Sequence, residues 1–183
     1  MTMITKLRAR VSPEAISKVT RIFNGTLDDI FNELFQNARR AGATRITVTA
    51  EHMGDACLIT VSDDGAGIAD PVDLLSLGQS DWSDECRTRE DPAGMGFFSL
   101  AGLETVVNSR SADGAFSLAI TGEAWTGEAD IDVLPFDGPR GTAIAFRFDP
   151  QPDGQLERCV EAAARFLAVP VSYNGKDLAR ADF

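Results

Sequence analysis

The sequence has few features that would mark a secreted, metal-binding or membrane protein. Its three cysteines are an odd number without metal-ligand spacing, so they fit reduced thiols in the cytoplasm. Cys57 and Cys159 have the surroundings of core residues. No apolar run approaches the roughly 18 residues of a membrane-spanning helix, and residues 1–10 lack the pattern of a signal peptide. A cytoplasmic protein without a membrane segment is therefore expected.

Basic residues are also scarce. The 183 residues contain 17 Lys and Arg against 28 Asp and Glu, a net charge of -11. This balance does not indicate a surface that grips the phosphates of a nucleic acid. The remaining composition, with 44% hydrophobic and 25% charged residues, is ordinary for a soluble globular protein. The length suits a single domain over residues 1–183.

Residues 26–41 predict an amphipathic helix. Thr26 is a suitable N-cap and Gly42 lies where a C-terminal cap is expected. Glu33 and Asn37 fall on one flank of the apolar stripe, where side chains are either solvated or face a cavity at the edge of the core. The stripe, with its three- and four-residue steps, consists of Leu27, Ile30, Phe31, Leu34, Phe35, Ala38 and Ala41.

The rest of the chain alternates between short helices and strands. We expect further helices at residues 13–24, 71–77, 97–103 and 155–167. Strands are expected at 44–50, 57–62, 105–111, 115–121, 129–134, 141–148, 169–173 and 176–179, with a strand or an arm at 4–11. Trp82 and Trp125 are expected on loops. This order predicts an α+β two-layer sandwich, a mixed and mostly antiparallel sheet covered on one face by helices.

Residues 78–94 are polar and charged and show no periodicity. So long a stretch without structure in a compact domain is typically functional or mobile, and we interpret it as a lid.

The strand before Asp63 aims a carboxylate at the covered face of the sheet. With a period of two, Asp63 points to the same side as Ile59 and Val61. A buried acid needs a partner or a ligand. Gly65 and Gly67 follow it in a turn, so Asp63 could hold the amine of a base while the glycines permit close packing.

Two further patterns suit a phosphorylated ligand. Gly94 and Gly96 precede the helix predicted at 97–103, where backbone N–H groups can approach a phosphate. Taken alone, such a pair is more often a plain turn. Glu33 could deprotonate a water molecule, and the carbonyl oxygen of Asn37 could bind Mg²⁺.

The motifs ELFQNARRAGATRITV, VSDDGAGI, GMGFFSL and GTAIAF occur in this order, with the lid between the second and the third. The ordered set resembles the GHKL ATPase family (gyrase, heat-shock chaperone, histidine kinase and MutL), which has the Bergerat fold. The resemblance covers residues 26–148. ELFQNA followed by AGATRI, and the tail FLAVPVSYNGKDL, are most similar to the MutL and chaperone branches.

This resemblance implies ATP and Mg²⁺ bound between the helices and the sheet, under the lid. It implies that Glu33 is the catalytic glutamate, that Asn37 binds the metal and that Asp63 reads the adenine. Thr142 would lie near the adenine. The positions implied to contact the nucleotide are Asn37, Asp63, Gly65, Gly67, Ile68, Gly94, Met95, Gly96, Phe97 and Thr142.

Three departures from the family pattern are visible. The MutL and chaperone branches usually have an acidic residue where this chain has Arg40. The common DNG motif is DDG here, so Asp64 replaces an asparagine. The lid has no obvious lysine for the γ-phosphate, and Arg87 or Arg89 would have to substitute.

Two functions are compatible with these motifs. The first is a slow ATPase, in which Mg-dependent hydrolysis drives lid closure and signals to a partner or a downstream domain. The second is a nucleotide-gated binding module with negligible hydrolysis. The relatives continue beyond the last predicted hairpin, which suits an N-terminal fragment of a longer protein, and family members often form homodimers on binding ATP. A histidine kinase is not favoured, because the only histidine, His52, lies in a predicted turn.

Overall fold

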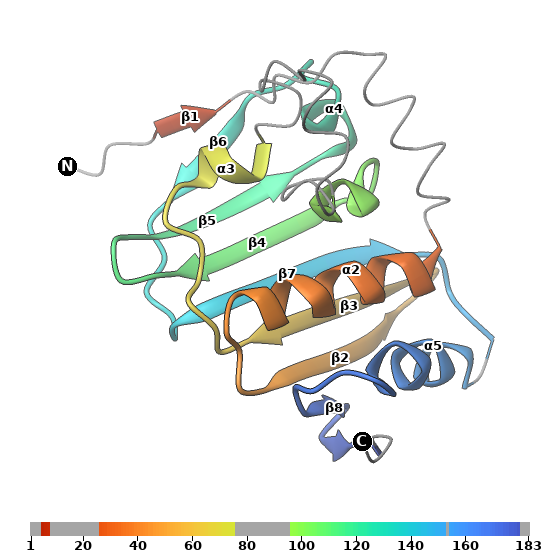
Figure 1. The fold of residues 1–183 in the computed structure, drawn as a ribbon. Coiled ribbons are helices and arrows are strands. Elements are labelled where there is room, and N and C mark those ends of the chain that lie inside the picture. Colours follow the sequence, from red (N-terminus) through yellow and green to blue (C-terminus); the bar gives the residue numbers. More distant parts are fainter. Residues whose placement is uncertain (1–4, 8–25, 76–95, 153, 180–183) are drawn as a thin grey trace, which may run out of the picture.

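The computed structural model describes residues 5–7, 26–75, 96–152 and 154–179 (Figure 1). Their strands form one nine-stranded sheet in the order β1-β6-β5-β4-β7-β3-β2-β8-β9. The β2–β8 pair is parallel, and the other neighbouring pairs are antiparallel. The strands are β1 (Thr5–Leu7), β2 (Ile46–Met53), β3 (Ala56–Asp63), β4 (Thr105–Arg110), β5 (Ala115–Ile120), β6 (Ile131–Leu134), β7 (Gly141–Phe148), β8 (Val171–Tyr173) and β9 (Lys176–Asp177).

Helices lie against one face of this sheet. Figure 1 shows α2 running along β7 and β3, with α5 beside it at the β2 and β8 end. The predicted α+β architecture, a mixed and mostly antiparallel sheet with helices on one face, is confirmed. The helices are α2 (Leu27–Arg40), α3 (Pro71–Leu75), the 3₁₀ helix η2 (Gly96–Leu100), α4 (Gly122–Trp125) and α5 (Gln155–Ala164).

The predicted helix over residues 26–41 is confirmed as α2. The side chain of Thr26 caps its start by accepting a hydrogen bond from the Asp29 backbone N–H at 3.2 Å. At its end, the Gly42 N–H donates to the Arg39 carbonyl at 3.0 Å. The apolar stripe is buried as expected except at Ala41, which is half-buried. The residues with almost no exposed surface are Leu27, Ile30, Phe31, Leu34, Phe35 and Ala38.

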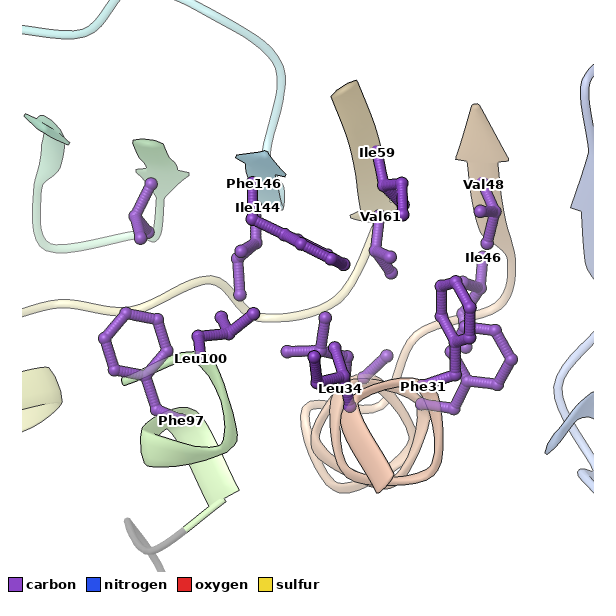
Figure 2. Packing of buried hydrophobic residues seen from close by; sticks show 14 of the residues in the cluster. Phe31, Leu34, Ile46, Val48, Ile59, Val61, Phe97, Leu100, Ile144 and Phe146 are labelled. Carbon is purple, nitrogen blue, oxygen red and sulfur yellow. The ribbon is translucent and has the colours of Figure 1, made fainter. Parts of the chain in front are cut away.

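The core fills the space between α2, η2 and the sheet. Figure 2 shows Phe31 and Leu34 of α2 pointing at the side chains of the central strands, while Phe97 and Leu100 of η2 point toward the sheet, with Leu100 beneath Ile144 of β7. The labelled strand residues are Ile46, Val48, Ile59, Val61, Ile144 and Phe146. Burial of each large side chain contributes about 1.5–3 kcal/mol, so this layer fixes the position of α2 over β3 and β7.

The predicted helix over residues 97–103 is wrong in its type and length. The chain forms only one short 3₁₀ segment, η2, that ends at Leu100. The Leu103 N–H bonds back to the Leu100 carbonyl, and Gly102 takes a φ of +90°, outside the helical region. The helix predicted at residues 155–167 also ends earlier, at Ala164.

Trp125 does not lie on a loop as expected. It belongs to α4, a one-turn helix capped by Thr121, and only 2% of its surface is exposed. Its indole N–H donates to the Leu103 carbonyl at 2.8 Å, and its ring lies 5.3 Å from that of Phe97. The sequence around it contains Gly122 and Gly127 and gave no apolar period, so the tertiary contacts decide this helix.

Several predictions fall outside the described residues: the helix at 13–24, the lid at 78–94, Trp82, Arg87 and Arg89. They stay predictions. His52 lies in β2 rather than in the turn, and it is exposed as expected. None of the helices that the structure describes is both long and apolar enough to cross a membrane.

Candidate functional site

A cavity of about 210 Å³ opens between α2 and the ends of β3 and β7. Its walls are mostly apolar, and three polar side chains, Asn37, Asp63 and Thr142, reach it from three different elements. The lining residues are Leu34, Asn37, Ala38, Ala41, Val61, Asp63, Gly67, Ile68, Leu74, Phe97, Thr142 and Ile144. Drug-sized ligands occupy cavities of about 300–1,000 Å³, so this one suits a nucleobase rather than a whole nucleoside triphosphate.

Asp63 is the acid of this cavity. It is the last residue of β3, and its register partner across the sheet is Thr142 of β7. Its carboxylate accepts a hydrogen bond from the Gly65 N–H at 2.8 Å. Burial raises the pKa of Asp63 above its ordinary value, while hydrogen bonds from the Gly65 and Thr142 backbone oppose that rise. The predicted inward orientation of Asp63 is confirmed, and burial makes its charge costly without a ligand.

Ser109 links the turn after Asp63 to β7. It is fully buried on the inward side of β4, and its Oγ accepts a hydrogen bond from the Ile68 N–H at 2.8 Å. The same oxygen lies 3.2 Å from the Gly141 carbonyl and 3.1 Å from Thr142 Oγ1. A single hydroxyl therefore holds Ile68 and Thr142, two residues of the cavity wall, in fixed relative positions.

The two glycines of the turn are required by close packing. Gly67 has a φ of +75°, and a Cβ at this position would lie 2.0 Å from the Arg110 carbonyl oxygen. A Cβ on Gly65 would lie 2.9 Å from both the Cβ and the carbonyl oxygen of Ala41. The Ala66 N–H between them donates to that same carbonyl at 2.8 Å. The turn is thereby clamped between the end of α2 and β4.

Asp64 points away from the cavity. Its carboxylate accepts hydrogen bonds from the Thr44 backbone N–H at 2.7 Å, from the Thr44 hydroxyl, and from the Arg45 N–H at 3.0 Å. These bonds, that of the Thr44 side chain first, hold the pKa of Asp64 below its ordinary value. The aspartate of the DDG motif thus anchors the start of β2, and it takes no part in lining the cavity.

Glu33 and Asn37 lie one turn apart on α2, and Asn37 lines the cavity. Glu33 is on the same side of the helix as Asn37 but does not line the cavity. The side chain of Glu33 is 19% exposed. Arg40 reaches both residues. Its Nη1 donates to Asn37 Oδ1 at 3.4 Å and lies 3.8 Å from Glu33 Oε1. The helical period explains this grouping, because positions i, i+4 and i+7 share one face.

No group of three or more His, Cys, Asp or Glu side chains in the described ranges is arranged to hold a metal ion. A metal at Asn37 would therefore take its other oxygen ligands from a phosphorylated ligand and from water. This is how Mg²⁺ is usually bound, with few protein ligands and several non-protein ones. The oxygen of the Asn37 carboxamide fits that requirement.

The glycines predicted to contact phosphate are only partly described. Gly96 begins η2 and Phe97 lines the cavity, with 4% of its surface exposed. Gly94 and Met95 lie outside the described residues. The short η2 does not supply the helix dipole that the predicted helix would have given, so any phosphate contact here would depend on individual backbone N–H groups.

Among the predicted nucleotide contacts, the cavity brings together Asn37, Asp63, Gly67, Ile68, Phe97 and Thr142, whereas Gly65 supports its wall. Sequence reasoning did not single out the remaining lining residues or Ser109. For Leu34, Ala38, Ala41, Val61 and Ile144 the signal was present, since they share the stripe or the strand parity of the predicted residues. Ser109 was detectable as a small polar residue on the inward parity of β4, whose other inward residues are also buried.

Comparison with known proteins agrees with this geometry. Residues 24–152, more than half of the chain, match the family described as histidine kinase-, DNA gyrase B-, and HSP90-like ATPase. No match was found among curated proteins. The matched range contains α2, the Asp63 turn, η2 and β7, the elements that form the cavity. The chain therefore belongs to the histidine kinase-, DNA gyrase B- and HSP90-like ATPases, the GHKL family.

Proposed function

We propose that the protein binds ATP with its base in the cavity between α2 and the β3 and β7 ends, and hydrolyses it slowly in the presence of Mg²⁺. The observation that carries the proposal is the placement of Asp63. A half-buried carboxylate stands in a mostly apolar cavity, with its pKa raised by burial. Such a group is a candidate for ligand recognition.

The proposed orientation of the base follows from the donors and acceptors. An ionised carboxylate only accepts hydrogen bonds, and the exocyclic amine of adenine is a donor. Asp63 keeps its Oδ1 engaged with the Gly65 N–H, which fixes the carboxylate plane and leaves acceptor capacity for the amine. Leu34 and Ile144 supply apolar surface for the faces of the ring.

We propose that Asn37, on the cavity wall, and Glu33, one turn before it on α2, serve the phosphates. Mg²⁺, when bound, would neutralise phosphate charge. Asn37 would hold it through the carboxamide oxygen. Glu33 would orient a water molecule and accept its proton, a role that requires hydrogen-bond reach to that water. We therefore assign Glu33 to hydrolysis and Asn37 to both binding and hydrolysis.

Calorimetric titration with ATP and Mg²⁺ tests the binding proposal. The parent is expected to bind and Asp63→Asn to lose binding. In the variant an amide NH₂ group replaces the second carboxylate oxygen, so a hydrogen-bond donor would face the amine of adenine, which is also a donor. Asp64→Asn is the matched control, since the neighbouring carboxylate faces Thr44 and not the cavity. Binding by the control but not by Asp63→Asn supports the site, and no binding by the parent overturns it.

A nucleotide-gated binding module with negligible hydrolysis is the second candidate, and the contact of Arg40 with Glu33 favours it. A glutamate held by a cation in its own helix is less free to turn toward water. Phosphate release separates the two functions. If Glu33→Ala lowers steady-state release from the parent rate, the protein is an ATPase. If the parent releases no more phosphate than the variant but still binds ATP, it is a binding module.

We further propose that the nucleotide signals through the segment at residues 78–94, acting as a lid, to a protein partner or a downstream region, with homodimerisation on ATP binding. We propose that the chain is a single cytoplasmic domain. The ELFQNA and AGATRI motifs support its assignment to the MutL and chaperone branches of the family. Cys57 and Cys159 carry free thiols, which suits a reducing compartment. A non-hydrolysable ATP analogue should protect the lid from protease, and light scattering should show the dimer.

A further inference from the structure

Arg40 ends α2 on the same side of the helix as Glu33 and Asn37. A step of seven residues makes about two turns and rotates the side chain by only about 20°, so the long side chain of Arg40 lies over the preceding two turns. Its Nη1 is shared between two acceptors, Asn37 Oδ1 at 3.4 Å and Glu33 Oε1 at 3.8 Å.

The ion pair joins a mostly buried acid to an exposed base. The side chain of Glu33 is 19% exposed and that of Arg40 44% exposed, so solvent screens the attraction only in part. Arg39 offers a comparison from the same turn. It also places a cation at the negative end of the helix dipole and is exposed like Arg40, but it forms no ion pair within the described ranges. The dipole alone therefore does not explain the placement of Arg40.

The position of the Arg40 guanidinium conflicts with metal binding at Asn37. An amide oxygen has two lone pairs, and Arg40 directs a donor at the oxygen that would be the metal ligand. A divalent cation on that oxygen would stand within a few ångströms of the guanidinium and be repelled by it. Metal binding is therefore opposed as long as the guanidinium stays beside Asn37.

We propose that Arg40 is a positioning residue that acts as a built-in brake on this site: it holds Glu33 and Asn37 together, and Mg²⁺ must displace it to reach Asn37. The inference rests on the proposed function. It implies that Mg²⁺ adds less to nucleotide affinity than the site would otherwise allow, and that Glu33 is withheld from water until Arg40 moves. A slow ATPase would be the consequence.

Titration with ADP measures the brake without hydrolysis. For each protein, the dissociation constant in EDTA is divided by that in Mg²⁺. Arg40→Gln, which keeps the aliphatic stem and removes the charge, should raise this ratio about fivefold or more, the lower range of coupling between two sites. Its affinity for ADP in EDTA should stay at the parent value. Arg39→Gln is the matched control, because it removes the same charge from the same turn, and it should leave both quantities unchanged.

Each other result overturns the brake. A ratio equal to that of the parent shows that Arg40 does not oppose the metal. A weaker affinity in EDTA shows that Arg40 itself holds a phosphate. If the parent binds no ADP in either buffer, the proposed function fails and the brake fails with it. Thermal melting checks that Arg40→Gln is folded, and Arg40→Ala replaces it in the same titration if it is not.

Discussion

Ser109 Oγ lies 3.1 Å from Thr142 Oγ1, and the two residues are register partners on β4 and β7. Thr142 has Asp63 as its partner on the other side, so Ser109, Thr142 and Asp63 form one row across three strands. Because Ser109 also accepts the Ile68 N–H, the row is joined to the turn that closes the cavity. The shape of the cavity therefore depends on a residue that does not line it.

Replacement of Ser109 by alanine should loosen this row. The Ile68 N–H would lose its acceptor in a partly buried place, which costs up to about 1–3 kcal/mol of the free energy of unfolding. ATP affinity should also fall, since Ile68 and Thr142 would no longer be held. Urea unfolding and calorimetry measure the two effects. Ser117→Ala, on the outward parity of β5, is the control and should change neither.

A second prediction separates backbone strain from steric conflict at a glycine. Gly67 and Gly54 have nearly equal φ values, +75° and +68°, but a Cβ would strike the Arg110 carbonyl at Gly67 and meet nothing within 4 Å at Gly54. Gly54→Ala should therefore cost only the left-handed backbone penalty, about 1–2 kcal/mol. Gly67→Ala should cost about 1–3 kcal/mol more and weaken ATP binding. Equal costs in urea unfolding would show that the turn can move away from β4.

The sequence was sufficient to predict the parts of the site that repeat a local period. The steps of three and four residues placed Asn37 beside the core, and the alternation of β3 aimed Asp63 inward. These predictions needed only geometry within one element. The family resemblance then supplied the relation between elements, because no period in one strand indicates its neighbour in the sheet.

What the sequence could not supply are contacts between side chains from separate segments. The anchoring of Thr44 by Asp64 joins residues 20 apart, and the bond from Ser109 to the turn joins residues 41 apart. The burial of Trp125 depends on the Leu103 carbonyl, 22 residues away. Arg40 is different, since its position seven residues after Glu33 was readable. The period places Arg40 on the face of both acceptors, and the length of its side chain allows it to reach back to them.

Asp64 makes a third prediction, on stability in acid. Its folded pKa is lowered, so its contribution is fully present above the unfolded value of about 3.9 and is lost as the pH falls through the folded value. Asp64→Asn removes this group from the titration. The urea midpoint of the variant should therefore fall less than that of the parent between about pH 5 and about pH 3. A steeper fall in the variant would contradict the assigned hydrogen bonds.

Asp63 should change the pH dependence of stability in the opposite direction to Asp64, because burial raises the folded pKa of Asp63. The cost of ionising it in the folded state is absent below the unfolded value of about 3.9 and grows as the pH rises to the folded value. Asp63→Asn avoids this cost, so the variant should gain stability relative to the parent as the pH rises from about 4, and should hold that gain at neutral pH.

The same raised pKa predicts how ATP binding depends on pH. The amine of adenine needs the ionised carboxylate as acceptor, so affinity should begin to fall with decreasing pH at a higher pH than an ordinary aspartate would allow. Calorimetry with the non-hydrolysable ATP analogue at decreasing pH measures where this fall begins, with Asp64→Asn as the control that should show the same fall. A fall in the parent that begins only at or below the ordinary aspartate value of about 3.9 would mean that Asp63 does not receive the amine. The stability gain of Asp63→Asn would survive that result, because it depends only on burial, so the two measurements separate the burial of the carboxylate from its use in recognition.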